Sequence, residues 1–193
     1  MSRWERSLEF RRLLEESPVI AAIKDETGLE RCLASDCQVV FILYGTICDI
    51  DNIVSRIHEA GKKAVVHLDL VGGMTPKEIS VDFIRTHTQA DGIISTRPNV
   101  IHYARQCGLL AIQRFFVIDS RALETACRQL ASSPPDVAEI LPGVMPRIIQ
   151  YIQKQTGAPV IASGLIQDKK DITDALQAGA CGVSSTKEET WFM

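Results

Sequence analysis

The sequence predicts an α/β fold in which eight parallel strands close into a barrel. Eight apolar, β-branched runs recur at short intervals, and each except the last is followed by a segment with helical spacing. Parallel strands need crossover connections, and such alternating helices supply them. Near-continuous apolar runs are typical of strands that are covered on both faces. Because about seven residues follow the last run, we expect a compact TIM-like (β/α)8 barrel with its last helix missing or replaced.

The expected elements follow one another in a regular order. A segment of mixed polar and apolar residues comes first, Arg3–Glu16, and we expect a helix there that lies across one end of the barrel. The predicted strands come next, at Val19–Lys24, Val39–Gly45, Lys63–Leu70, Asp91–Thr96, Leu109–Phe116, Val137–Gly143, Pro159–Leu165 and Cys181–Thr186. An open doubly wound sheet is the rival architecture, but no GxGxxG motif follows the first strand.

Composition places the chain among ordinary globular proteins. Its 193 residues, 46% of them hydrophobic and 23% charged, suit a single phosphate-binding barrel domain over residues 1–193. No apolar run approaches the roughly 18 residues that a membrane span needs, so we expect a cytoplasmic protein with no membrane partner. Six cysteines without a CxxC pair predict no metal site and no cofactor. A net charge of −3 excludes binding to nucleic acid through global positive charge, but not through a local basic patch.

Polar residues interrupt the apolar runs near their carboxyl ends. Barrels of this kind gather functional groups there, whereas the strand middles pack the core. His67 and Asp69 alternate in the run HLDL, so they share one face of the third strand. The other polar residues in this position are Lys24, Arg97, Gln113, Arg114 and Glu139. Buried charges are costly unless they are paired, so charges of both signs inside apolar strands predict a polar pocket.

Several of these side chains also have a purely structural explanation. His67 could be a core imidazole bonded to a neighbouring strand. Arg114 and Glu139 could pair only with each other, and Lys24 could be a solvated surface lysine. The set is therefore stronger evidence for a pocket than any single member.

The stretch PVIASGLIQDKKDITDALQAGACGVSST, residues 159–186, has the layout of a phosphate site. Ser163 and Gly164 end the seventh predicted strand, and a glycine there lets backbone N–H groups approach an anion. Ser184, Ser185 and Thr186 end the eighth strand and offer further donors. The loops after strands seven and eight form the usual phosphate site of phosphate-binding barrels. The alternative is that Gly164 only makes a turn and that the hydroxyls cap local backbone.

Four blocks of the chain carry a resemblance to a known family. They are KAVVHLDLVGG, ADGIISTRPNVIHYARQCGLLAIQRFFVIDS, VAEILPGVMPRII and the segment PVIASGLIQDKKDITDALQAGACGVSSTKEETW. In this order they resemble the glycerol uptake operon antiterminator regulatory proteins of bacteria, from about Val19 to Trp191. The seventh strand of that family commonly ends in two glycines, whereas this chain has Ser163 and Gly164. One glycine remains, so we expect the phosphate site to remain.

The resemblance implies a regulator that binds glycerol 3-phosphate and acts on the leader mRNA of glycerol-utilisation operons. Phosphate would lie on the Gly164 and Ser184–Thr186 loops, with Lys24 or Arg97 as its cation, and Asp69 or Glu139 would accept hydrogen bonds from the glycerol hydroxyls. No RRM or KH signature is present, so RNA contact needs a basic patch. The candidates are Arg3, Arg6, Arg11 and Arg12, the pair Lys62 and Lys63, and the pair Lys169 and Lys170.

Two other functions stay open at this point. A lyase, isomerase or synthase of the phosphate-binding barrel class could act on a small phosphorylated polyol, with Lys24 as a Schiff-base or electrostatic residue and Asp69 or Glu139 as general base. A scaffold that binds a metabolite without RNA is the third reading. The sequence also leaves the oligomeric state open, a homo-oligomer included.

Overall fold

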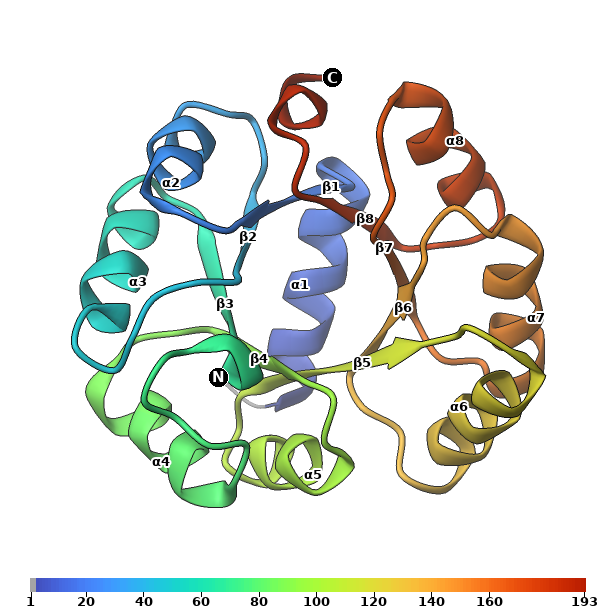
Figure 1. Cartoon of the computed structure of the whole chain (residues 1–193), viewed down its shortest axis with the longest axis horizontal. Helices are drawn as coiled ribbons and strands as arrows, with labels where there is room; N and C mark the ends of the chain where they lie inside the picture. The colour runs from blue at the N-terminus through green and yellow to red at the C-terminus, as the bar shows by residue number, and fades with distance from the viewer. Residues whose placement is uncertain (1–2) are drawn as a thin grey trace.

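Eight parallel strands form a closed barrel in chain order, and the last strand pairs with the first (Figure 1). A computed structural model of the chain describes residues 3–193. The strands are β1 (Val19–Ile23), β2 (Val39–Ile42), β3 (Lys63–His67), β4 (Gly92–Ser95), β5 (Leu110–Phe116), β6 (Val137–Leu141), β7 (Val160–Ser163) and β8 (Gly182–Ser185). The predicted (β/α)8 barrel is confirmed. Several predicted runs extend past the strands; the run Lys63–Leu70, for example, ends in a turn of 3-10 helix, η1 (Leu68–Leu70).

Helices surround the barrel between successive strands (Figure 1). They are α2 (Glu26–Leu33), α3 (Ile50–Glu59), α4 (Glu78–His87), α5 (Pro98–Gln106), α6 (Ser120–Ser132), α7 (Pro146–Thr156) and α8 (Lys169–Gln177). Asp25, Asp119 and Asp168 accept hydrogen bonds from the first turns of α2, α6 and α8. Such side chains satisfy N–H groups that have no partner within the helix, which sets where each helix begins.

The strands separate two apolar layers. The outer layer lies between the sheet and the helices, and it includes Val40, Val66 and Ala162. The inner layer fills the barrel and includes Ile20, Phe41, Val65, Ile112 and Ile161. Side chains of a strand alternate between these layers, which is why the runs are apolar at almost every position.

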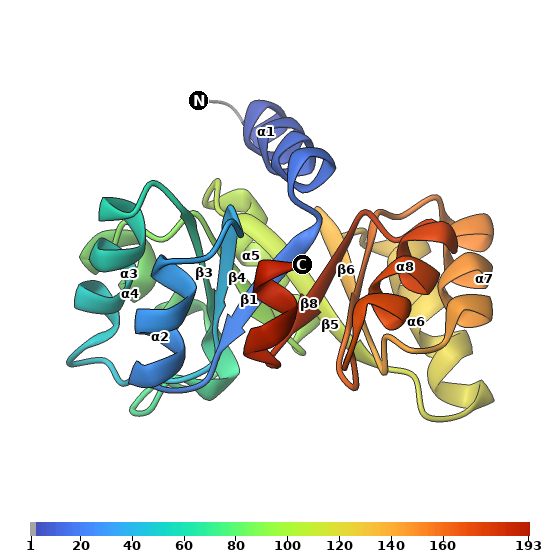
Figure 2. The same cartoon turned by 90° about the horizontal axis from the view of Figure 1, so that it is seen from above.

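The helix α1 (Arg3–Glu16) lies across the end of the barrel where the strands begin (Figure 2). Phe10 and Leu14 are buried and pack against the inner layer. A Cβ built at Gly182, the first residue of β8, would lie 3.2 Å from Leu14 Cδ1, so the leucine packs directly on the start of that strand. The expected helix across one end is confirmed, and it closes this end of the barrel.

A short 3-10 helix, η2 (Glu188–Phe192), follows β8 in place of an eighth outer helix. Trp191 is 2% exposed, and its indole Nε1 donates to the Ser185 carbonyl at 2.9 Å. Cys37 Sγ lies 3.6 Å from the Trp191 carbonyl, and Arg31 pairs with Glu188 at 3.1 Å. The prediction that the last helix is replaced is therefore confirmed. Within residues 3–193, no helix combines the length and apolar character that crossing a bilayer requires.

Candidate functional site

Polar side chains fill the inner face of the barrel near the carboxyl ends of the strands. They come from five strands and are all nearly or fully buried: His67, Arg114, Glu139, Ser163 and Ser184. In the sheet register, Arg114 lies opposite Glu139, and Ser163 lies opposite Ser184. Each of the first three was predicted as a pocket residue, and the structure brings them together in one layer.

The strongest interaction in this layer is the ion pair of Arg114 and Glu139. Arg114 Nε donates to Glu139 Oε2 at 2.6 Å, and Arg114 Nη2 donates to Glu139 Oε1 at 3.0 Å. The side chain of Arg114 is 9% exposed and that of Glu139 is 0% exposed. A guanidinium carries five N–H donors, so this pair leaves three of them for other acceptors. Arg114 also lines a groove of about 450 Å³ together with Thr96 and Phe116.

His67 lies beside this ion pair and is only 2% exposed. Burial lowers the pKa of His67 to about 4, and the Arg114 charge adds to this effect, against the opposing charges of Glu139 and Asp69. The imidazole is therefore neutral at pH 7, with one donor and one acceptor nitrogen. Its Nδ1 atom is buried and has no hydrogen-bond partner among the described residues, and the same is true of Ser184 Oγ.

Asp69 lies on η1, at the point where β3 ends. Its Oδ1 accepts a hydrogen bond from Ser95 Oγ at 2.6 Å, and its Oδ2 accepts from the Thr96 N–H at 2.8 Å and from Thr96 Oγ1 at 2.7 Å. Burial alone would raise the pKa of Asp69, but these three hydrogen bonds keep it below the usual value. The carboxylate is thus held ionised and fastens the end of β3 to the end of β4. Sequence reasoning missed Ser95 and Thr96, although both hydroxyls stand beside Arg97 in the block GIISTR.

Two of the predicted polar positions face away from the barrel interior. Gln113 Nε2 donates to Gln129 Oε1 on α6 at 2.9 Å, so the prediction that Gln113 belongs to the pocket is wrong. Its neighbour Arg114 faces inward, and alternation sends Gln113 toward the helices. Ser185 Oγ donates to the Ile166 carbonyl at 3.2 Å and accepts from the Lys187 N–H at 3.0 Å. The Ser185 hydroxyl therefore stabilises the loops after β7 and β8 instead of facing the interior.

The loop after β7 has an unusual backbone. Gly164 has a φ of +78°, and Leu165, which follows it, has a φ of +62°. Positive φ is costly for a residue with a side chain, and such residues cluster at functional sites. A Cβ at Gly164 would lie 3.2 Å from Leu141 Cδ2, so the position is also crowded on one side. The bare glycine backbone and the exposed Thr186 lie at the ends of neighbouring strands, as the predicted phosphate site requires.

Lys24 and Arg97 are both exposed, at the ends of β1 and β4. In the closed barrel β1 is the direct neighbour of β8, whereas β4 lies on the opposite side of the ring. Lys24 is therefore placed beside the loop that carries Thr186 and one strand further from Gly164, and Arg97 is placed beside Asp69 and Thr96.

Comparison with known proteins shows the family of this chain. A family model described as "Glycerol-3-phosphate responsive antiterminator" matches residues 19–191. The chain belongs to this family.

Relatives of known sequence or structure support the assignment. The Escherichia coli (strain K12) protein YgcP is 42% identical over 179 residues, which are 93% of this chain and 94% of YgcP. The solved glycerol uptake operon antiterminator regulatory protein of Listeria monocytogenes has a TM-score of 0.87 and 33% identity, over 91% of this chain and 95% of that one. An antiterminator-related protein from Thermotoga maritima has a TM-score of 0.82 and 30% identity, over 91% and 98% of the two chains.

A deoxyribose phosphate aldolase from Aeropyrum pernix shares the fold at 16% identity, with a TM-score of 0.68 over 98% of this chain and 95% of that one. At this identity the likeness concerns the barrel alone.

The basic residues predicted for RNA contact in this family member are scattered over the molecule. Arg11 and Arg12 are exposed on α1, at the end of the barrel opposite the polar layer, and Arg12 forms a 3.5 Å pair with Glu16. The side chains of Arg3 and Arg6, also predicted, lie outside the described residues. The remaining predicted positions are Lys62, Lys63, Lys169 and Lys170.

Lys62 is not on the surface, so its prediction as a contact residue is wrong. It is 8% exposed, and its ammonium donates to the carbonyls of Ser35 and Cys37. Lys63 pairs with Glu9 and Asp91 at 3.2 Å each. Lys169 and Lys170 begin α8 and are exposed, and Lys170 pairs with Asp174.

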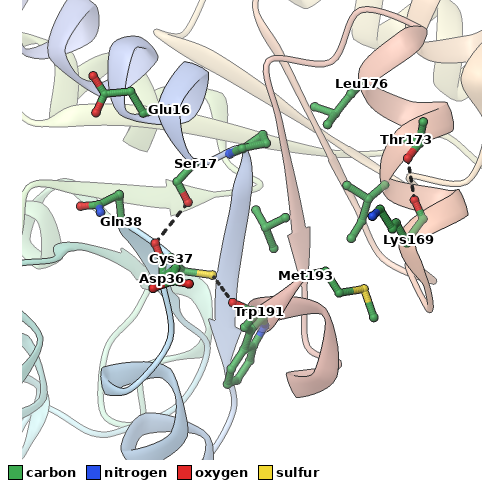
Figure 3. Close-up of a pocket in the computed structure, with 13 residues that line it drawn as sticks. Glu16, Ser17, Asp36, Cys37, Gln38, Lys169, Thr173, Leu176, Trp191 and Met193 are labelled. Carbon is green, nitrogen blue, oxygen red and sulfur yellow. Dashed lines mark hydrogen bonds between the residues drawn. The ribbon is translucent and has the colours of Figure 1, made fainter.

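A second hollow lies on the outside of the barrel, where an outer helix after β8 would pack if η2 did not replace it (Figure 3). It measures about 510 Å³ and lies between η2 and α8, with Val19, Ile172, Leu176, Trp191 and Met193 among its lining residues. Because these side chains belong to the outer layer and the chain end, the hollow is separate from the polar layer inside the barrel.

Proposed function

We propose that this member of the antiterminator family senses glycerol 3-phosphate inside the mouth of its barrel and binds the leader mRNA of glycerol-utilisation operons, without converting its ligand. The observation that carries the proposal is the contrast between free and engaged polar groups in the mouth. Backbone and hydroxyl groups for a phosphate are available at the ends of β7 and β8, whereas the two carboxylates, Asp69 and Glu139, are fixed in other interactions.

The phosphate is assigned to the loops after β7 and β8. Gly164 leaves room for an anion close to the backbone, and Thr186 and Lys187 are exposed on the neighbouring loop. Phosphate-binding barrels use these two loops. Lys24, at the end of the adjacent strand β1, supplies the cation that neutralises the phosphate. Arg97 lies across the ring, too far round to be its first partner.

The state of the two carboxylates favours a sensor over an enzyme. A general base works best with a pKa near the operating pH and with a free lone pair directed at the substrate proton. Asp69 has a lowered pKa and accepts three hydrogen bonds, and both oxygens of Glu139 accept from Arg114. Lys24 is exposed, whereas Schiff-base lysines are activated by desolvation or by a neighbouring cation.

RNA contact is assigned to the four predicted arginines of the N-terminal segment, and the structure describes the side chains of two of them, Arg11 and Arg12 on α1, which are exposed. The chain carries a net charge of −3. Because few cations are available to displace counterions from RNA, affinity should be modest and should fall only gently with added salt.

Calorimetry on a matched pair of variants tests the ligand site. Gly164→Asp should abolish binding of glycerol 3-phosphate, because it brings a negative charge into the loop that is assigned to the phosphate. Gly164→Ala has the same backbone penalty at φ +78° without the charge, and it should keep measurable binding. If folded Gly164→Asp binds glycerol 3-phosphate as tightly as Gly164→Ala, the assigned phosphate site is wrong. Recovery of chemically altered ligand would favour the enzyme instead.

A further inference from the structure

We propose that His67 Nδ1 and Ser184 Oγ recognise the hydroxyl groups of the ligand, and that they restrict the site to phosphorylated polyols with an uncharged end. The inference deepens the proposed function and rests on it. It also replaces the sequence-based assignment of the hydroxyls to Asp69 or Glu139.

These two atoms have unused hydrogen-bonding capacity. His67 is 2% exposed and Ser184 is 1% exposed, and neither polar atom has a partner in the part of the chain that the structure describes. Leaving a buried donor or acceptor unsatisfied costs about 1–3 kcal/mol, so folded proteins keep few such groups. Both atoms belong to inward-facing residues at the carboxyl ends of their strands, β3 and β8. A ligand that enters the mouth would satisfy both.

The two free groups are chemically complementary to an alcohol. A neutral imidazole nitrogen either donates or accepts, and a serine hydroxyl does both. An alcohol on the ligand also does both, so it can pair with either group. By contrast, the oxygens of Asp69 and Glu139 already accept hydrogen bonds from Ser95, Thr96 and Arg114. The free groups, and not the occupied ones, are the better partners for hydroxyls.

The charge around His67 disfavours a ligand with an anionic inner end. One cation, Arg114, and two carboxylates, Glu139 and Asp69, act on His67, and the imidazole itself stays neutral. The surroundings of His67 therefore carry a net charge of about −1. A carboxylate or second phosphate at the inner end of the ligand would meet this charge without a free cation, and buried unpaired charge is costly. The site should accept glycerol 3-phosphate and reject phosphoglycerate.

The test compares three ligands by calorimetry: glycerol 3-phosphate, propyl phosphate and 3-phosphoglycerate. Propyl phosphate keeps the phosphate and lacks the hydroxyls, so it uses only the outer part of the site. The wild-type chain should bind glycerol 3-phosphate at least about tenfold more tightly than propyl phosphate. It should bind 3-phosphoglycerate more weakly than glycerol 3-phosphate.

Two variants then assign the preference to single atoms. Ser184→Ala and His67→Phe should each reduce the preference for glycerol 3-phosphate over propyl phosphate by about tenfold, while propyl phosphate binds as before. That unchanged binding also shows that the variants are folded. Ser35→Ala removes another buried hydroxyl, which donates to the Cys32 carbonyl outside the inner layer, and it should leave the preference intact.

The outcomes distinguish failure of this inference from failure of the proposed function. If both variants keep the full preference, the hydroxyls are read elsewhere and the inference is overturned, while the proposed function stands. Tighter binding of 3-phosphoglycerate than of glycerol 3-phosphate would also overturn it. If the wild-type chain does not bind glycerol 3-phosphate at all, the proposed function and the inference fail together.

Discussion

The two halves of the barrel interior are built from the same strands but differ in chemistry. The half near α1 is apolar, and Phe10 and Leu14 of this helix close it. The half at the carboxyl ends contains the Arg114–Glu139 pair and a neutral histidine. On four strands, successive inward-facing residues change from apolar to polar between the two halves. The pairs are Val65 and His67, Ile112 and Arg114, Val137 and Glu139, and Ile161 and Ser163.

This difference shows how the fold divides stability from recognition. The apolar half removes hydrocarbon from water, which stabilises the barrel without specifying a ligand. The polar half costs desolvation free energy that its internal pairs only partly recover. Ligand binding explains why the chain keeps a polar layer at this cost, because barrels bind ligands at the carboxyl ends of their strands. Removing groups from the two halves should therefore have different consequences.

The largest effect is expected from breaking the ion pair. Glu139→Ala should lower the free energy of unfolding by about 3–5 kcal/mol, because it leaves the Arg114 charge buried without its partner. The double variant Arg114→Met with Glu139→Leu turns this part of the polar half into a copy of the apolar half. It should recover most of the stability but not the binding of glycerol 3-phosphate.

Denaturant unfolding and calorimetry measure the two quantities. The exposed pair of Lys170 and Asp174 is the control, and Lys170→Ala should change the free energy of unfolding by no more than about 1 kcal/mol. Full ligand affinity in the double variant would show that the ion pair serves only the fold.

A change in the apolar half should lower the free energy of unfolding without lowering ligand affinity. Leu14→Ala should lower the free energy of unfolding by about 3 kcal/mol through the cavity that it leaves at the start of β8. Glycerol 3-phosphate affinity of the folded variant should stay at the wild-type value. A loss of affinity as large as that of the double variant would mean that the two halves are not independent.

The histidine gives the polar half a pH dependence that the apolar half lacks. His67 has a pKa of about 4 in the folded chain and about 6.5 when unfolded. Below pH 6.5, His67 is protonated in the unfolded chain but stays neutral in the folded chain. The free energy of unfolding therefore falls as the pH falls. The loss should reach about 3 kcal/mol between pH 6.5 and pH 4.

Unfolding in denaturant across this pH range measures the effect, with His67→Phe as the comparison. In His67→Phe, the free energy of unfolding should not show this fall between pH 6.5 and pH 4. Asp69 has a lowered pKa, so its own contribution to the free energy of unfolding is lost only at more acidic pH. Identical slopes in both proteins would contradict the environment described for His67.

Much of this division could be predicted from the sequence, because strand alternation and the position of polar residues at run ends are visible there. His67, Arg114 and Glu139 were placed correctly. Gln113 was not, because a strand buried on both faces gives no signal of which face is inward. The prediction for Lys62 was also wrong. Two adjacent lysines are typical of an exposed pair, whereas the side chain of Lys62 is buried. The free atoms of His67 and Ser184 depend on three-dimensional hydrogen bonding, which no local pattern encodes.

The coupling between ligand and RNA tests the central claim most directly. An effector must bind the RNA-competent state better than the other state, and linkage then requires RNA to raise ligand affinity by the same factor. Titration of glycerol 3-phosphate with and without leader RNA should show an increase of about 5–150-fold when RNA is present. Charge reversal at Arg11 and Arg12 should weaken RNA binding and leave ligand affinity in the absence of RNA unchanged. Equal ligand affinity with and without RNA in the wild-type chain would contradict the account and leave only a metabolite-binding barrel.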